Sequence, residues 1–214
     1  MPYKPSGVTP DSGFNMVLGP GAFYFGIDTS LITPTTTAEE FGVILQTALE
    51  GGKCIGVTEG DGTFSLVPTF REITMAGVTS PVVGSQVLQR WDVFLAGTAK
   101  EMTLLNLKRL LVTPRIVTAT GALTVSNTLL PCHYIPHFSW AGMYNDGDLL
   151  YIDLENVLNT AGFVAGLPAE GEMTAPFEFH AFQADLANMQ NVPVNIWQFE
   201  WATPIDDECE SLEP

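Results

Sequence analysis

The chain has 214 residues, of which 46% are apolar and 15% are charged, a composition that supports a buried core and argues against an intrinsically disordered chain. It carries 24 acidic and 8 basic residues, for a formal net charge of −16, and residues 116–214 contain no lysine or arginine. A surface of this sign repels the phosphates of nucleic acids and of anionic lipids. Conventional nucleic-acid binding and docking on membranes are therefore not expected.

The sequence gives no sign of secretion, disulfides or membrane spans. Cys54, Cys132 and Cys209 are odd in number and form no C-x-x-C pair, so we expect no disulfide framework. Residues 1–11 contain no apolar signal core, and no apolar run approaches the ~18 residues of a membrane helix. The pattern predicts a protein that folds in the cytosol and does not insert into membranes.

The first quarter of the chain predicts an arm, a strand and a helix. Residues 1–13 contain three prolines and predict an extended arm. Residues 15–28 are strand-like on both sides of a Gly-Pro-Gly break. Thr37, with Glu40 three positions later, predicts a helix N-cap with a capping box, and Gly51 can end that helix. The apolar residues of this helix recur at core-facing spacing: Phe41, Ile44, Leu45, Ala48 and Leu49.

A second helix has the same pattern. Thr98 and Glu101 predict its N-cap and capping box, and Pro114 stops it. Apolar residues at 102–111 predict its buried side.

Most of the remaining chain alternates apolar and polar residues, with turn-forming pairs such as Asp61-Gly62 between the runs. The strand-like segments are 63–75, 87–95, 115–128, 149–157, 173–182 and 192–201. Together with the helices they predict a mainly β (α+β) fold, a β-barrel or sandwich with a flanking α-helix. We expect three parts: an N-terminal arm at 1–13, a β domain at 14–201 and an acidic C-terminal arm at 202–214.

No constellation of residues predicts catalysis, a metal site or a cofactor. Cys132, His133 and His137 are ligating residue types, but positions four apart on an extended segment lie about 13 Å from each other, whereas an ion bonds at about 2 Å. Residues 56–62 are glycine-rich but lack the Lys-Ser/Thr pair of a phosphate loop. Residues 144–148 lack the ligand ladder of a calcium loop and predict a turn between two strands. We therefore expect no enzyme.

Several short motifs across residues 14–200 belong together. Gly19–Asp28 (G-P-G-A-F-Y-F-G-I-D) is a glycine-led aromatic strand that ends in Asp, and Ile55–Phe64 (I-G-V-T-E-G-D-G-T-F) follows it. Later segments continue the series: Phe70–Ile73 (F-R-E-I), Gly77, Gly84, Phe177–Phe182 (F-E-F-H-A-F) and Val192-Pro193-Val194. This series resembles the major tail tube proteins of long-tailed (siphovirus-type) bacteriophages. The chain departs from the family pattern in an added helix at 37–52, in Ala76 where Asp is usual, and in Glu59 and Asp61, where basic or small residues are frequent.

The resemblance implies a β-barrel-like tail-tube fold with a flanking helix, shared with the type VI secretion tube protein. It implies six copies in a ring, and rings stacked into a tube whose channel conducts DNA without binding it. The implied partners are the chain itself and the tail terminator, baseplate or distal tail and tape measure proteins. The implied location is the virion tail, after assembly in the host cytoplasm. Two alternatives stay open: the inner tube of a type VI secretion or contractile injection system, and another virion protein for decoration or tail completion.

Contacts between copies are expected in two places. The first is the extended loop that we expect from Thr58 to Val83, and our candidates in it are Glu59, Asp61, Phe64, Phe70 and Arg71. The second is the pair of terminal arms, with Tyr3, Asp206, Asp207 and Glu208 as candidates. An acidic channel wall would let DNA slide, since double-stranded DNA carries one negative charge per about 1.7 Å of axis. We expect Asp in place of Phe64 or Phe70 to abolish polymerisation and spare the monomer fold.

Overall fold

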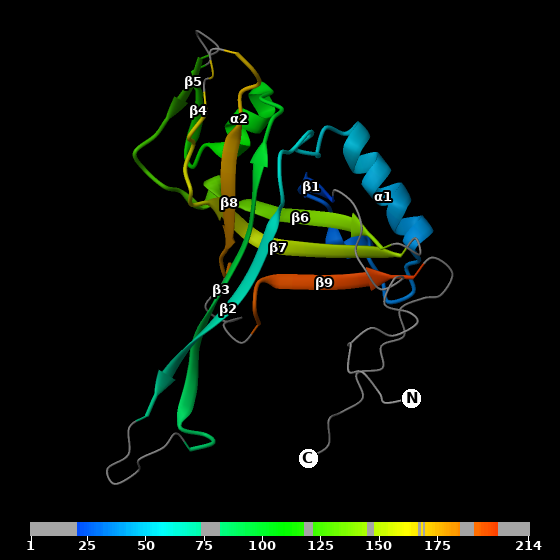
Figure 1. Cartoon of the computed structure of the whole chain (residues 1–214), viewed down its shortest axis with the longest axis vertical. Helices are drawn as coiled ribbons and strands as arrows, with labels where there is room; N and C mark the ends of the chain where they lie inside the picture. Colours follow the sequence, from blue (N-terminus) through cyan, green and yellow to red (C-terminus); the bar gives the residue numbers. More distant parts are fainter. Residues whose placement is uncertain are drawn as a thin grey trace, which may run out of the picture. The chain divides into compact units, whose positions relative to one another are not determined.

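The computed structural model describes residues 21–73, 82–117, 122–144, 148–166, 168, 170–184 and 191–200 (Figure 1). It confirms the mainly β class with two α-helices. The chain forms two compact units. Unit 1 comprises Met1–Gly56, His137–Asp153 and Asn195–Pro214, and unit 2 comprises Val57–Pro136 and Leu154–Val194.

Unit 1 combines short strands with the longer helix. Its elements are β1 (Ala22–Phe25), the 3-10 turn η1 (Thr29–Leu31), α1 (Ala38–Glu50), most of β6 (Ile135–Met143), the first half of β7 (Leu149–Asn159) and β9 (Val194–Phe199). The strand order is β1-β6-β7, with β9 also paired to β7. β1 and β6 are antiparallel, in register from Ala22↔Ala141 to Phe25↔Phe138.

An aromatic cluster forms the core of unit 1. The Phe41 ring of α1 stacks on Phe199 at a centroid distance of 4.3 Å and meets the edge of Tyr151 at 4.7 Å. All three side chains are fully buried. Burial raises the pKa of Tyr151 well above its ordinary value, and the nearby charge of Asp153 raises it further. Because aromatic rings bury large apolar areas, these contacts fix α1 on the sheet.

The capping box predicted for α1 is present. The Thr37 hydroxyl accepts a hydrogen bond from the Glu40 backbone N–H at 3.3 Å, and the Glu40 carboxylate accepts one from the Thr37 N–H at 3.1 Å. Two of the backbone donors that a helix start leaves unpaired are thereby satisfied. The helix ends at Glu50, followed by Gly51 as C-cap, as the sequence predicts.

Unit 2 is built around a long hairpin. Its elements are β2 (Thr63–Glu72), β3 (Gln86–Ala99), α2 (Leu104–Leu110), β4 (Pro114–Val117), β5 (Ala122–Val125), the 3-10 turn η2 (Pro131–His133), the second half of β7 and β8 (Ala175–Ala181). The strand order is β7-β8-β3-β2, and β4 and β5 form a separate two-stranded sheet. The pairs β2–β3, β3–β8 and β7–β8 are antiparallel.

The start of the second helix was predicted wrongly. Thr98 still belongs to β3, where it pairs with Pro176 of β8, and the helix begins only at Leu104. Thr103 is the N-cap, and its hydroxyl accepts a hydrogen bond from the Asn106 backbone N–H at 3.1 Å. Thr98 and Thr103 both precede the leucine-rich run that forms the helix. Because β3 stays paired with β8 as far as Ala99, Thr98 belongs to the strand and Thr103 caps the helix.

Asn159 ties three segments of unit 2 together. Its side-chain amide donates to the carbonyl oxygens of Leu110 at 2.7 Å and Gly162 at 3.0 Å, and its Oδ1 accepts from the Glu178 N–H at 3.0 Å. The side chain is almost fully buried. Asn159→Ala leaves these backbone groups without their partner, and we expect a loss of about 3 kcal/mol in unfolding free energy. Chemical denaturation measures this, and Thr160→Ala, at the exposed neighbouring position, serves as the control.

Candidate interaction surface

The β2–β3 hairpin extends beyond the rest of its sheet. β3 is 14 residues long, but only Phe94–Ala99 pair with β8. Figure 1 shows β2 and β3 continuing side by side past the end of β8. Since facing residues of an antiparallel pair point to the same side, the register of the hairpin sorts its side chains into two faces.

The first face, here called the apolar face, runs outward from the core. It consists of Phe64, Leu66, Pro68 and Phe70 of β2, paired with Leu95, Val93, Trp91 and Leu88 of β3. At its inner end Val93 and Leu95 are 2% exposed. At its outer end Trp91 is 39% exposed and Phe70 is 53% exposed. The same stripe is therefore part of the core at one end and uncovered at the other, which is the pattern of a surface that meets another protein.

The second face, here called the basic face, combines aliphatic and positively charged side chains. On β2 and β3 it includes Val67, Arg71, Val87 and Arg90, all exposed. Neither guanidinium forms an ion pair with any residue that the structure describes. Asp92 lies on the same face, but its carboxylate contacts the His180 ring, with Oδ1 3.0 Å from Nδ1. The outer part of this face is thus positive in a chain whose net charge is −16.

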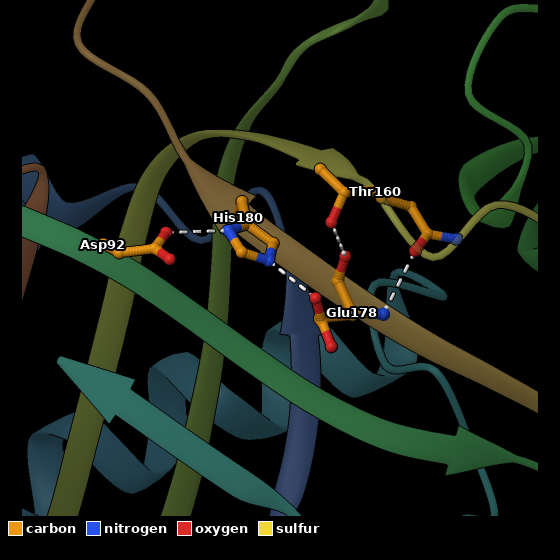
Figure 2. A network of polar contacts seen from close by, with 5 residues as sticks. Asp92, Thr160, Glu178 and His180 are labelled. Carbon is orange, nitrogen blue, oxygen red and sulfur yellow. Dashed lines mark hydrogen bonds and ion pairs between the residues drawn. The ribbon is translucent and has the colours of Figure 1, made fainter. Parts of the chain in front are cut away.

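A polar network anchors the inner end of the basic face (Figure 2). The His180 ring of β8 lies between two carboxylates, with Nδ1 at 3.0 Å from Asp92 and Nε2 at 2.7 Å from Glu178. The ring also stacks on Phe94 at a centroid distance of 5.0 Å. Asp92 belongs to β3 and His180 to β8, so their contact links the two strands. The network therefore clamps β3 to β8 where the hairpin leaves the sheet.

The outer edge of the hairpin is blocked for strand pairing. β2 is the last strand in the order β7-β8-β3-β2, so its outer edge has no strand neighbour among the described residues. Pro68 sits in the middle of β2 and has no N–H to offer. The register also shifts between Thr69 and Phe70, as in a β-bulge. Both features discourage edge-to-edge pairing, which leaves the two faces as the surfaces for contact.

The structure separates the five candidates that the sequence placed together. Phe70 and Arg71 lie on the projecting half of β2, on opposite faces. Phe64 faces buried Leu95 at the inner end of the apolar face. Asp61 is exposed in the loop before β2, and Glu59 lies beside β3, where its backbone N–H donates to the Thr98 carbonyl. The described part of the segment expected as a loop therefore contains β2, one strand of a hairpin.

Glu59 takes part in a small ion-pair group at the base of the hairpin. Lys100 Nζ lies 3.0 Å from Glu172 and 3.6 Å from Glu59. The hydrogen bond to Glu172 raises the pKa of Lys100, and the negative charges of Glu172 and Glu59 raise this pKa as well. Glu59 is thus engaged within its own chain. The candidates Tyr3, Asp206, Asp207 and Glu208, with both arms, lie outside the described residues.

Sequence reasoning missed β3 as the partner in the candidate surface. It named no residue of β3, although Leu88, Trp91 and Arg90 complete the two faces. The sequence V-L-Q-R-W does contain large apolar residues. The register of the hairpin places one of them, Leu88, opposite the candidate Phe70.

The structure places the cysteine and histidine candidates in two different elements. Cys132 and His133 lie in η2, whereas His137 belongs to β6 and its Nδ1 lies 2.8 Å from the buried Asp153 carboxylate. Among the described residues no three His, Cys, Asp or Glu side chains are grouped to hold a metal ion. No helix in the same part of the chain has the length and apolar character to cross a membrane.

Comparisons with known proteins do not assign a family. No protein-family model and no curated protein matches the sequence. A solved structure titled "Virion of native gene transfer agent (GTA) particle" contains a similar chain, with 10% identity and a TM-score of 0.35, over 60% of this chain and 82% of that one. A TM-score of 0.35 is too low for this likeness to support a shared fold or function.

Proposed function

We propose that this protein is a structural virion subunit that self-assembles into stacked rings, six copies to a ring, and so forms the tail tube of a long-tailed phage. The observation that carries the proposal is the apolar face of the β2–β3 hairpin. A strand pair that exposes Phe70, Leu88 and Trp91 beyond its sheet needs a partner to cover them. A second copy supplies that partner in an assembly of identical subunits.

The motifs of the sequence and the charge of the chain agree with this function. Gly19–Asp28, Ile55–Phe64 and Phe70–Ile73 resemble the tail tube family, and the last of these motifs lies at the outer end of β2. A chain with 24 acids and 8 bases gives a ring with a strong negative charge. Part of this charge would face the channel and would keep DNA from adhering to it during ejection.

Electron microscopy of the purified full-length protein tests the proposal. We expect hollow tubes with a regular axial repeat to form as protein concentration is raised, with monomers or single rings at low concentration. Analytical ultracentrifugation of the same samples measures the concentration at which polymer forms. A protein that stays monomeric throughout this series, at any ionic strength, contradicts the proposal.

A further inference from the structure

An open groove runs along α1 in unit 1. Its volume is about 380 Å³, and its lining includes Glu39, Gly42, Leu45, Leu49 and Leu149. Leu49 is 49% exposed, and Leu45 and Leu149 are half-buried. Aliphatic side chains therefore line much of the groove. It carries one carboxylate, at the N-terminal end of the helix, and its lining contains no lysine, arginine or histidine.

Gly42 keeps this groove open. A glycine in the interior of a helix costs about 1 kcal/mol relative to alanine. A Cβ added at Gly42 would meet no atom within 4 Å, so no described part of the chain needs the space. The missing side chain is thus unexplained by packing within the chain, and it leaves room for atoms of another molecule.

Charged side chains on the two surfaces favour a contact of the hairpin with the groove. Among the described residues, unit 1 holds seven acidic residues and one basic residue, a net charge of −6, whereas unit 2 holds nine acidic and six basic residues, a net charge of −3. Two copies of unit 1 therefore repel each other strongly. The basic face of the hairpin, with Arg71 and Arg90, is a positive surface of unit 2. Both units carry a net negative charge, so the attraction is local, between these arginines and Glu39 of the groove. A repeated contact between unlike surfaces leads to open-ended polymers.

We propose that the groove along α1 receives the basic face of the β2–β3 hairpin from a second copy of this chain. This inference rests on the proposed self-assembly and names the surface that accepts the hairpin. The apolar face stays available for a separate contact.

The dimensions and chemistry of the two surfaces correspond. Val67 and Arg71 lie four residues apart on a strand, about 13 Å. Glu39 and Leu49 lie ten residues apart on a helix, about 15 Å. Arg71 of one copy can therefore pair with Glu39 of the next while Val67 packs near Leu49. Neither Glu39 nor Arg71 has an ion-pair partner among the described residues of its own chain.

Filling the groove tests the inference. Gly42→Leu adds a side chain where there is free space, so the monomer keeps its melting temperature or gains in it. We expect its critical concentration for tube formation to rise at least tenfold. Thr47→Leu is the control, because it places a leucine on another side of α1, in a different groove, and removes only the hydrogen bond from the exposed Thr47 hydroxyl to the Val43 carbonyl. That variant forms tubes like the wild type.

A charge swap tests the contact directly. We expect Glu39→Arg and Arg71→Glu each to raise the critical concentration, and the double variant to recover most of the loss at low ionic strength. The double variant restores assembly only if the two side chains meet across the interface. Additive losses in the double variant, or normal tubes from Gly42→Leu, overturn the groove as the acceptor site. Wild-type protein that forms no tubes contradicts the proposed function instead, so the two failures are distinguishable.

Discussion

Phe70→Asp is expected to abolish tube formation while the monomer keeps its fold. Phe70 is 53% exposed on the projecting half of the apolar face, so the single chain loses little when it is replaced. In the proposed assembly the same position is covered, and burying Phe contributes about 1.5–3 kcal/mol, while a buried carboxylate adds a further cost. A loss of about 3 kcal/mol per contact raises the critical concentration by about two orders of magnitude. Sedimentation and electron microscopy measure this loss.

Val164→Asp is the control for that experiment. Val164 is 64% exposed and lies in unit 2 outside the hairpin. An Asp at this position therefore adds the same negative charge at a site that is not part of the apolar face. Tubes from Phe70→Asp at the wild-type concentration would show that the apolar face is not a contact. Phe64→Asp is a less clean variant, because Phe64 faces buried Leu95 and its replacement also weakens the sheet.

Phe41→Ala is expected to destabilise unit 1 by about 3–5 kcal/mol, the range for phenylalanine truncation in a closed core. The Phe41 ring is 0% exposed and contacts Phe199 and Tyr151, so its removal leaves a cavity between α1 and the strands. Urea denaturation followed by circular dichroism gives the change in unfolding free energy. Val43→Ala, at a 63% exposed position of the same helix, should change it by no more than about 0.5 kcal/mol. Similar losses in both variants would contradict the aromatic cluster as the contact that holds α1, since alanine has a higher helix propensity than either residue it replaces.

The sequence predicts local structure well where one residue pattern dictates one conformation. The capping box of Thr37 and Glu40 depends on atoms three positions apart, and it is present as predicted. β6 was missed because Pro136, His137 and Gly142 are unusual for a strand, and its stability comes from pairing with β1 across more than 100 residues of chain. Long-range pairing of this kind leaves no local signal in the sequence.

The candidate surface was only partly predictable for a similar reason. The apolar residues of β2 are visible in the sequence, and the structure places the candidates Phe70 and Arg71 on the projecting half of that strand. Whether an apolar residue of β2 is buried or exposed depends on how much of β3 pairs with β8, and the sequence does not show this. Phe64 and Phe70 look equivalent in the sequence, yet the first faces buried Leu95 and the second projects beyond the sheet.

Pro68 has a consequence for how this protein behaves when many copies are made at once. An uninterrupted ten-residue edge strand would let newly made chains add to one another by main-chain hydrogen bonds, in any number and with little regard to sequence. The proline removes a donor from the middle of that edge. In the proposed assembly, growth then depends on side chains that fit in one orientation only. A crowded pool of subunits can therefore remain dispersed and avoid amyloid-like fibres until a correctly oriented end is available.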